Sequence, residues 1–179
     1  MDVLIKWIVV SDKKAFIFFN HKINNRILDT IMTRLTHFGG ATFTISSLLI
    51  CILLFNNIIR IWSLEALLSL SISHILAQII KKNYGRPRPY LSITDARTIS
   101  KPLIDYSFPS GHTTSGFAIA TTFALHSNVL ALIFLPIAIL IGLSRIYLGL
   151  HYPTDCIFGA LLGTVTSMIV FNIFSYFLI

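Results

Sequence analysis

The stretch SRIYLGLHYPTD, residues 144–155, joins two long apolar runs of the chain. It places Arg145, His151 and Asp155 close together in a sequence whose apolar segments otherwise hold few charges. Two further polar segments precede it, one basic and rich in proline, the other reading Pro-Ser-Gly-His. Together the three segments supply cations suited to holding an oxyanion and histidines suited to proton transfer. This combination predicts phosphoryl transfer without a metal ion.

The composition is that of a membrane protein. Of the 179 residues, 55% are hydrophobic and only 12% are charged, and the length suits one domain. The net charge of +7 does not indicate nucleic-acid binding, because no basic face studded with aromatic residues lies outside the apolar segments. Cys51 and Cys156 lack the paired spacing of a disulfide framework or a zinc site.

The apolar runs predict an all-α integral membrane helical bundle with about five spans, each near the ~20 residues that a bilayer core requires. The expected spans are residues 39–58, 61–81, 112–126, 129–149 and 154–178. Residues 1–38 instead alternate apolar and charged positions, which favours interfacial helices over a further span. We therefore expect a single membrane domain over residues 1–179, with an interfacial N-terminal segment (1–38) and a helical bundle (39–179).

Short linkers predict antiparallel neighbouring spans, so four span ends fall on one side of the membrane. The second span ends at Lys81, the third begins at His112, the fourth ends at Arg145 and the fifth begins after His151. Residues far apart in the sequence are therefore expected to meet at one end of the bundle.

On the second span Ser71, His74, Gln78 and Lys81 recur at helical spacing and form one polar stripe. Because lipid offers no hydrogen-bond partner, this stripe is expected to face the bundle interior. For the first three residues a buried seam between helices explains the pattern as well as a functional role does. Lys81 differs because it lies at the end of its span.

Lys81, Arg88 and Arg145 share the expected location of both histidines, which favours anion binding by all three. Guanidinium groups bind phosphate oxygens two at a time, and an ammonium acts as a point charge. The alternative is that these cations anchor span ends at the interface, as we expect for Lys82 and Arg86.

The third span is preceded by Ser110, Gly111 and His112. Ser110 can cap the helix, and Gly111 lets backbone N–H groups approach a ligand closely. Since helix N-termini bind anions, His112 would lie beside a bound phosphate. A simple N-cap with an exposed histidine is the alternative.

The last span is expected to begin near Pro153, which places Asp155 in its first turn and His151 just before it. The carboxylate could accept a hydrogen bond from one imidazole nitrogen and leave the other as a nucleophile. Alternatively, Asp155 only stabilises the dipole of its own helix.

Residues 81–89, 109–112 and 144–155 contain the patterns K-x6-R-P, P-S-G-H and S-R-x5-H-x3-D. In order and at every defining position they resemble the three signature motifs of the type 2 phosphatidic acid phosphatase superfamily. That family includes membrane lipid phosphatases, undecaprenyl pyrophosphate phosphatases and vanadium haloperoxidases. The chain departs from many six-span members in its weak first span.

The resemblance implies a role for each matched residue. His151 would attack phosphorus and form a phosphohistidine, with Asp155 orienting it. His112 would protonate the leaving oxygen and then activate the hydrolytic water. The residues implied to hold the phosphate oxygens are Lys81, Arg88, Ser110, Gly111 (through its backbone) and Arg145. Neither a metal ion nor a cofactor is implied.

The expected function is therefore that of a membrane lipid phosphatase, most similar to undecaprenyl pyrophosphate phosphatases. Phosphatidylglycerophosphate and phosphatidate stay open as substrates, because an anion site reads only the phosphate. A haloperoxidase is disfavoured because those relatives are soluble and much larger. An anion transporter is disfavoured because the polar groups gather at one face instead of lining a path. The expected partners are a lipid phosphate and membrane lipids, not nucleic acid, and the sequence leaves the oligomeric state open.

Two indications disagree about which side of the cell membrane holds the site. The positive-inside rule places it in the cytoplasm, because most of the remaining Lys and Arg residues lie on its side. The resemblance places it outside, where related bacterial enzymes work. Since basic residues near an anion site bias the charge count, we expect an extracytoplasmic site in a multi-pass protein.

Overall fold

A computed structural model of the chain describes residues 2–99 and 103–178. These residues form helices joined by turns and loops, with no strand among them, which confirms the all-α class. In chain order the elements are α1 (Asp2–Ile17), the π-helix η1 (Phe18–Lys22), α2 (Arg26–His37), α3 (Ala41–Leu54), α4 (Asn57–Tyr84), α5 (Pro89–Ser92), α6 (Gly111–His126), α7 (Asn128–Tyr147) and α8 (Pro153–Leu178).

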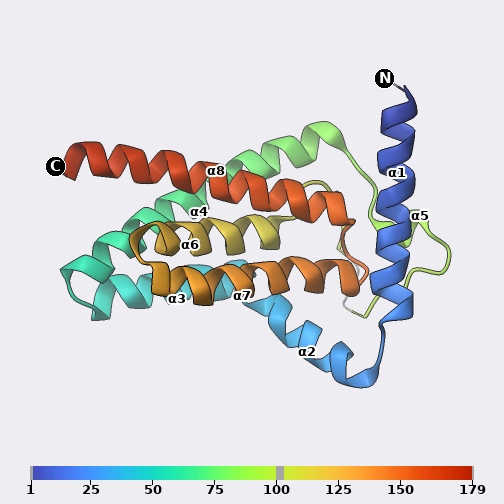
Figure 1. Cartoon of the computed structure of the whole chain (residues 1–179), viewed down its shortest axis with the longest axis horizontal. Helices are drawn as coiled ribbons and strands as arrows, with labels where there is room; N and C mark the ends of the chain where they lie inside the picture. Colours follow the sequence, from blue (N-terminus) through green and yellow to red (C-terminus); the bar gives the residue numbers. More distant parts are fainter. Residues whose placement is uncertain (1, 100–102, 179) are drawn as a thin grey trace.

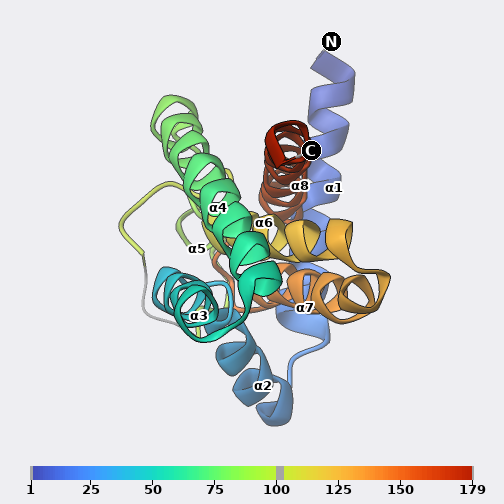
Figure 2. The same cartoon turned by 90° about the vertical axis from the view of Figure 1, so that its left-hand side faces the viewer.

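Helix α6 lies at the centre of the bundle, where it packs against α3, α4, α7 and α8 (Figure 2). Small and hydroxylated residues dominate its buried surface, among them Thr114, Gly116 and Ala118. Small side chains let helix backbones approach closely, which is how membrane helices associate when lipid is as apolar as leucine. The short α6 is thereby enclosed by longer neighbours.

Two glycines of α8 show how close this approach is. A Cβ atom on Gly159 would lie 2.7 Å from the carbonyl oxygen of Ser110, and one on Gly163 would clash with the carbonyl oxygen of Thr114. Any larger side chain would push α8 away from the start of α6. The small-xxx-small spacing in the last span therefore serves helix packing.

The described residues contain three helical stretches long and apolar enough to cross a bilayer: Asn57–Ser92, which includes α4, and then α7 and α8. Helices α2 and α3, bent by 53°, add a fourth if they form one broken span. The count of five spans is not confirmed. Helices α3 and α6 have 14 and 16 residues, about 21 and 24 Å of helix, and fall short of a ~30 Å hydrocarbon core.

Only part of the polar stripe expected on α4 is buried. Lys81 is buried and Gln78 is half-buried, whereas Ser71 and His74 are exposed. The two exposed residues line an open hollow whose other walls come from α3 and α6. The hydroxyl of Ser71 donates to the carbonyl oxygen of Leu67 at 2.7 Å, so it needs no partner from another helix.

Helix α1 crosses the end of the bundle where α7 joins α8, instead of running along the bundle (Figure 1). Phe16 is fully buried there, in a cluster that includes Tyr152. Asn20 of η1 is buried too, and its side-chain amide donates to the carbonyl oxygens of Arg97 and Tyr147, both at 2.9 Å. The N-terminal segment is thus docked on the end of the bundle that carries the predicted site.

Candidate active site

The four helix ends expected to share one side of the bundle lie together (Figure 1). Lys81 is in the last turn of α4, His112 in the first turn of α6 and Arg145 in the last turn of α7, while His151 follows in the loop before α8. His112 is near enough to Arg145, His151 and Lys81 to interact electrostatically with each. The structure therefore brings both predicted histidines into one cationic cluster.

A glycine and two prolines direct the chain out of α4 into this cluster. Gly85 ends the helix in the left-handed conformation, with φ of 60°, which glycine adopts without strain. Pro87 and Pro89 then keep the helix from resuming through Arg86 and Arg88. Arg88 has an extended backbone, and its side chain is 1% exposed.

The imidazole of His151 is buried between an arginine and a carboxylate. Its Nε2 lies 3.2 Å from Nη1 of Arg88, and its Nδ1 lies 3.6 Å from Oδ2 of Asp155. The second distance is too long for the hydrogen bond expected from the sequence, so the two groups face each other without bonding. Burial lowers the pKa of His151 to about 3, and the charges of Arg145 and Arg88 act in the same direction. The imidazole is therefore neutral, as a nucleophile must be.

Asp155 is fully buried and both of its carboxylate oxygens accept hydrogen bonds. Oδ1 accepts from Nη1 of Arg86 at 2.6 Å. Oδ2 accepts from the hydroxyl of Ser107 and from the backbone N–H of Tyr152, the latter at 2.9 Å. The carboxylate does more than stabilise its own helix, because residues from three segments fix its orientation.

One carboxylate, that of Asp105, bridges the two cations expected to bind phosphate. Its Oδ2 lies 2.7 Å from Nζ of Lys81, and its Oδ1 lies 2.6 Å from Nη2 of Arg88. Burial alone would raise the pKa of the Asp105 carboxyl, but hydrogen bonds and charges from Lys81 and Arg88 lower it to about 2. Arg88 also donates to the carbonyl oxygens of Asp105 and Leu150, both at 2.8 Å.

The start of α6 presents backbone donors to the same cluster. Ser110 is the N-cap residue, but its side chain makes no capping bond, contrary to expectation. Its hydroxyl oxygen instead accepts from Thr113 Oγ1 at 2.9 Å, so the Ser110 hydroxyl can donate elsewhere. The first N–H groups of a helix, here from Gly111 onward, have no acceptor within the helix. They are free to bind an anion.

Arg145 and His112 complete the cluster. Arg145 is 3% exposed, and its Nη1 donates to the hydroxyl of Thr36 on α2 at 2.8 Å. Its Nε has no hydrogen-bond partner among the described residues. His112 is half-buried beside the turn between α2 and α3, with its Nε2 3.6 Å from the position of a Cβ on Gly40. A Cβ on the neighbouring Gly39 would lie only 2.8 Å from the carbonyl oxygen of His112, so the lack of a side chain there lets the turn approach α6 closely.

All eight site residues predicted from the sequence lie at this end of the bundle, together with four that sequence reasoning missed. Arg86 was expected to be a simple interfacial anchor, yet it contacts Asp155. The other three are Thr36, Asp105 and Ser107. The repeated Arg-Pro pairs could have indicated a functional role for Arg86, whereas no local sequence pattern predicts one for Thr36. No group of three or more His, Cys, Asp or Glu that could hold a metal ion occurs within residues 2–99 and 103–178.

Fold and site define a helical membrane protein with a cationic cluster and two histidines at one end of its bundle. The chain belongs to the PAP2 superfamily, whose family model matches residues 62–179. This confirms the resemblance drawn from the three motifs.

Curated relatives agree with this membership. The chain is 31% identical over 112 residues to the bacitracin transport permease protein BcrC of Bacillus licheniformis, covering 63% of this chain and 55% of that protein. It is 28% identical to the undecaprenyl-diphosphatase BcrC of Bacillus subtilis, covering 83% of this chain and 76% of the relative. It is also 28% identical to phosphatidylglycerophosphatase B of Bacillus subtilis, covering 80% and 73%. The chain thus spans between about half and three quarters of the length of these relatives.

Solved structures show the same fold. The crystal structure of Aquifex aeolicus LpxE superposes with a TM-score of 0.81 at 27% identity, covering 89% of this chain and 93% of the other. A transmembrane PAP2-type phosphatidylglycerolphosphate phosphatase from Bacillus subtilis superposes with a TM-score of 0.78 at 24% identity, covering 97% and 87%. At that identity the second likeness speaks for the fold alone.

Proposed function

We propose that the protein is an integral membrane phosphatase that hydrolyses the phosphate or pyrophosphate headgroup of a lipid through a phosphohistidine. The PAP2 family and its named relatives support a hydrolase acting on lipid phosphates. The observation that carries the proposed mechanism is the buried, neutral His151 within the cationic cluster that also holds His112.

In the first step Nε2 of His151 attacks phosphorus, because Nδ1 faces the carboxylate of Asp155. A P–N bond forms as the P–O bond to the lipid breaks, and His112 gives a proton to the leaving oxygen. In the second step His112 takes a proton from water, the resulting hydroxide attacks phosphorus as the P–N bond to His151 breaks, and inorganic phosphate leaves. Asp155 stabilises the positive charge that develops on His151.

The phosphate oxygens would be held by Lys81, Arg88 and Arg145, by the hydroxyl of Ser110 and by the backbone N–H of Gly111. Positioning and charge stabilisation are most of what phosphoryl transfer requires from a protein. The unpartnered Nε of Arg145 is one donor that this role would satisfy. Lys81 and Arg88 would exchange the carboxylate of Asp105 for phosphate oxygens.

Undecaprenyl pyrophosphate is the substrate we propose, in line with the named activity of one Bacillus subtilis relative. Phosphatidylglycerophosphate is the second candidate, favoured by the name of another. The test is phosphate release by the purified protein from a panel of polyprenyl and glycerolipid phosphates in detergent. We expect the highest kcat/KM with a polyprenyl pyrophosphate. A preference for phosphatidylglycerophosphate would select the second substrate, and no release from any lipid would refute the function.

The active site is proposed to face the outside of the cell, with residues 1–38 at the interface and the whole chain acting as one membrane domain. The lie of α1 across the end of the bundle supports interfacial placement (Figure 1). The exposed positions Asp95 and Asn128 belong to opposite ends of the bundle. In a Cys51→Ser background, an impermeant thiol reagent applied to intact cells should label Asp95→Cys and spare Asn128→Cys. The reverse pattern would place the site in the cytoplasm.

A further inference from the structure

The N-terminal helix contributes a carboxylate to the start of α8. Asp12 of α1 accepts from the backbone N–H of Thr154 at 2.9 Å and from the Thr154 hydroxyl at 2.6 Å. Thr154 lies in the first turn of α8, where N–H groups lack acceptors within the helix and negative charge is favourable. Asp12 therefore caps α8 from a different helix.

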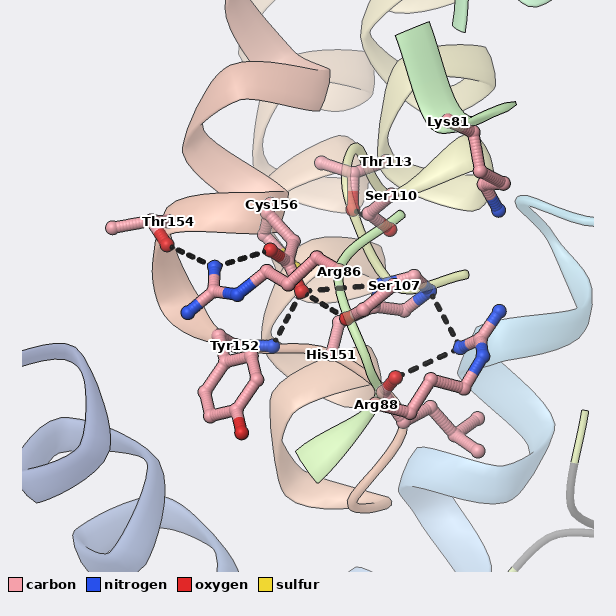
Figure 3. Close-up of polar contacts among 12 residues, drawn as sticks. Lys81, Arg86, Arg88, Ser107, Ser110, Thr113, His151, Tyr152, Thr154 and Cys156 are labelled. Atoms are coloured by element: carbon pink, nitrogen blue, oxygen red, sulfur yellow. Dashed lines mark hydrogen bonds and ion pairs between the residues drawn. The ribbon is translucent and has the colours of Figure 1, made fainter. Parts of the chain in front are cut away.

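Arg86 connects this cap to the buried carboxylate of Asp155, and Figure 3 shows its guanidinium reaching toward Thr154. Its Nη2 lies 2.7 Å from Oδ2 of Asp12. Its Nη1 donates to Oδ1 of Asp155 at 2.6 Å and to the hydroxyl of Thr154 at 2.8 Å. The guanidinium also lies over the ring of Tyr152, 4.0 Å from the ring centroid. The planar fork thus joins α1, the segment after α4 and the start of α8.

Because these groups are buried, each charge depends on its partners within the protein. The side chains of Asp12 and Asp155 are 1% and 0% exposed, and that of Arg86 is 18% exposed. Two buried carboxylates depend on one cation, and loss of either contact would leave a charge without compensation. Because Ser107 and Tyr152 occupy the second oxygen of Asp155, Arg86 decides how the first oxygen is held.

We infer that Asp12 and Arg86 are positioning residues, which act through Asp155 on the imidazole of His151, and that α1 is part of the active site. Asp155 does not bond His151 but stands 3.6 Å from it, so a small rotation of the carboxylate changes how it orients the imidazole. Asp12 lies outside the family-matched residues 62–179, so the family motifs do not include it. The inference rests on the proposed role of His151 as nucleophile.

The test uses the full chain with Asp12→Asn and Arg86→Lys, because larger truncations risk misfolding. Asparagine replaces one accepting oxygen of Asp12 by a donor, and lysine keeps the charge of Arg86 without its fork. Each variant is expected to lower kcat roughly tenfold to 100-fold, the scale of a misplaced catalytic group, with KM changed less than about twofold. The matched controls are Lys13→Gln on α1 and Lys82→Gln on α4, both at exposed positions, and both should keep the wild-type kcat.

A second readout separates positioning from simple docking of α1. Nitrogen-15 NMR of histidine-labelled protein reports the His151 tautomer, and His151→Ala assigns its signals. We expect Asp12→Asn to shift these signals at an unchanged unfolding midpoint. The inference would be overturned if Asp12→Asn kept the wild-type kcat and left the NMR signals of His151 unchanged. A lower unfolding midpoint with kcat and these signals unaltered would show that Asp12 only docks α1, which would also overturn it. If the wild type hydrolyses no lipid phosphate, the proposed function fails, while the NMR shift still decides whether Asp12 positions His151.

Discussion

Charged side chains are paired differently at the two ends of the bundle. Among the described residues, all five pairs of a Lys or Arg with a carboxylate lie at the active-site end. At the far end Glu65 of α4 pairs with His126 of α6 at 2.8 Å, with Trp62 stacked on the imidazole. There each partner is matched one to one. At the active-site end Lys81 and Arg88 share the single carboxylate of Asp105.

This difference separates a structural charge from a functional one. A matched pair between two helices contributes packing and leaves no charge for a ligand. Arg145, by contrast, is buried, and within the described residues the hydroxyl of Thr36 is the one hydrogen-bond partner of its side chain. Such a surplus of positive charge is costly to bury unless an anion joins it. The comparison therefore predicts loss of activity from changes at one end and loss of stability from changes at the other.

The largest effect is expected from the two histidines of the cluster. His151→Ala and His112→Ala should each lower phosphate release by on the order of 10⁴-fold or more, because each removes a group that makes or breaks a bond. Both variants should still insert and fold. Release of labelled phosphate from the lipid substrate by purified protein is the measurement, and substantial turnover by either variant would contradict the assigned roles.

The matched change at the far end should do the opposite. His126→Ala leaves Glu65 buried without its partner, and we expect a loss of roughly 2 kcal/mol of unfolding free energy. The loss is moderated because Glu65 can take up a proton instead. Thermal unfolding in detergent measures the change. The kcat of the folded fraction should equal that of the wild type, and a large drop in kcat would mean that the two ends are coupled.

A smaller effect is expected where Asp105 bridges two cations. Asp105→Asn removes the carboxylate that competes with phosphate, so inhibition by inorganic phosphate should tighten about tenfold, or 1.4 kcal/mol. The control is Asp95→Asn in the same loop, because Asp95 is exposed and belongs to none of the ion pairs among the described residues. Weaker inhibition in Asp105→Asn would show that the carboxylate orients Lys81 and Arg88 for the ligand instead of shielding them.

The smallest effect concerns acid. The pKa of Asp105 is lowered from 3.8 to about 2 in the folded protein. The ionised carboxylate therefore stabilises the fold above about pH 4, and this stabilisation is lost as the pH falls toward 2. The contribution is small because the side chain is half exposed. Unfolding midpoints between these pH values should fall less in Asp105→Asn than in the wild type, and equal slopes would contradict the assignment.

Local patterns predicted much of the fold and site. The helices α4, α7 and α8 begin and end within four residues of the expected spans, because apolar runs, asparagine caps and Gly85 act over short distances. The motif residues were identifiable for a similar reason, since each lies at a helix end or in a loop with restricted backbone. The number of spans was less certain, because a short helix such as α6 can be enclosed by its neighbours.

By itself, the sequence determined that this is a helical membrane protein with two histidines and three cations expected at one end. Apolar length and alternating direction require that arrangement. Only the tertiary structure decided which groups hold these histidines and cations in place. It showed that Arg86 supports Asp155 instead of only anchoring a helix end, left Ser71 and His74 beside an open hollow between helices, and brought Asp12 to α8. Contacts between distant segments depend on how helices rotate and dock, and no local pattern encodes that geometry.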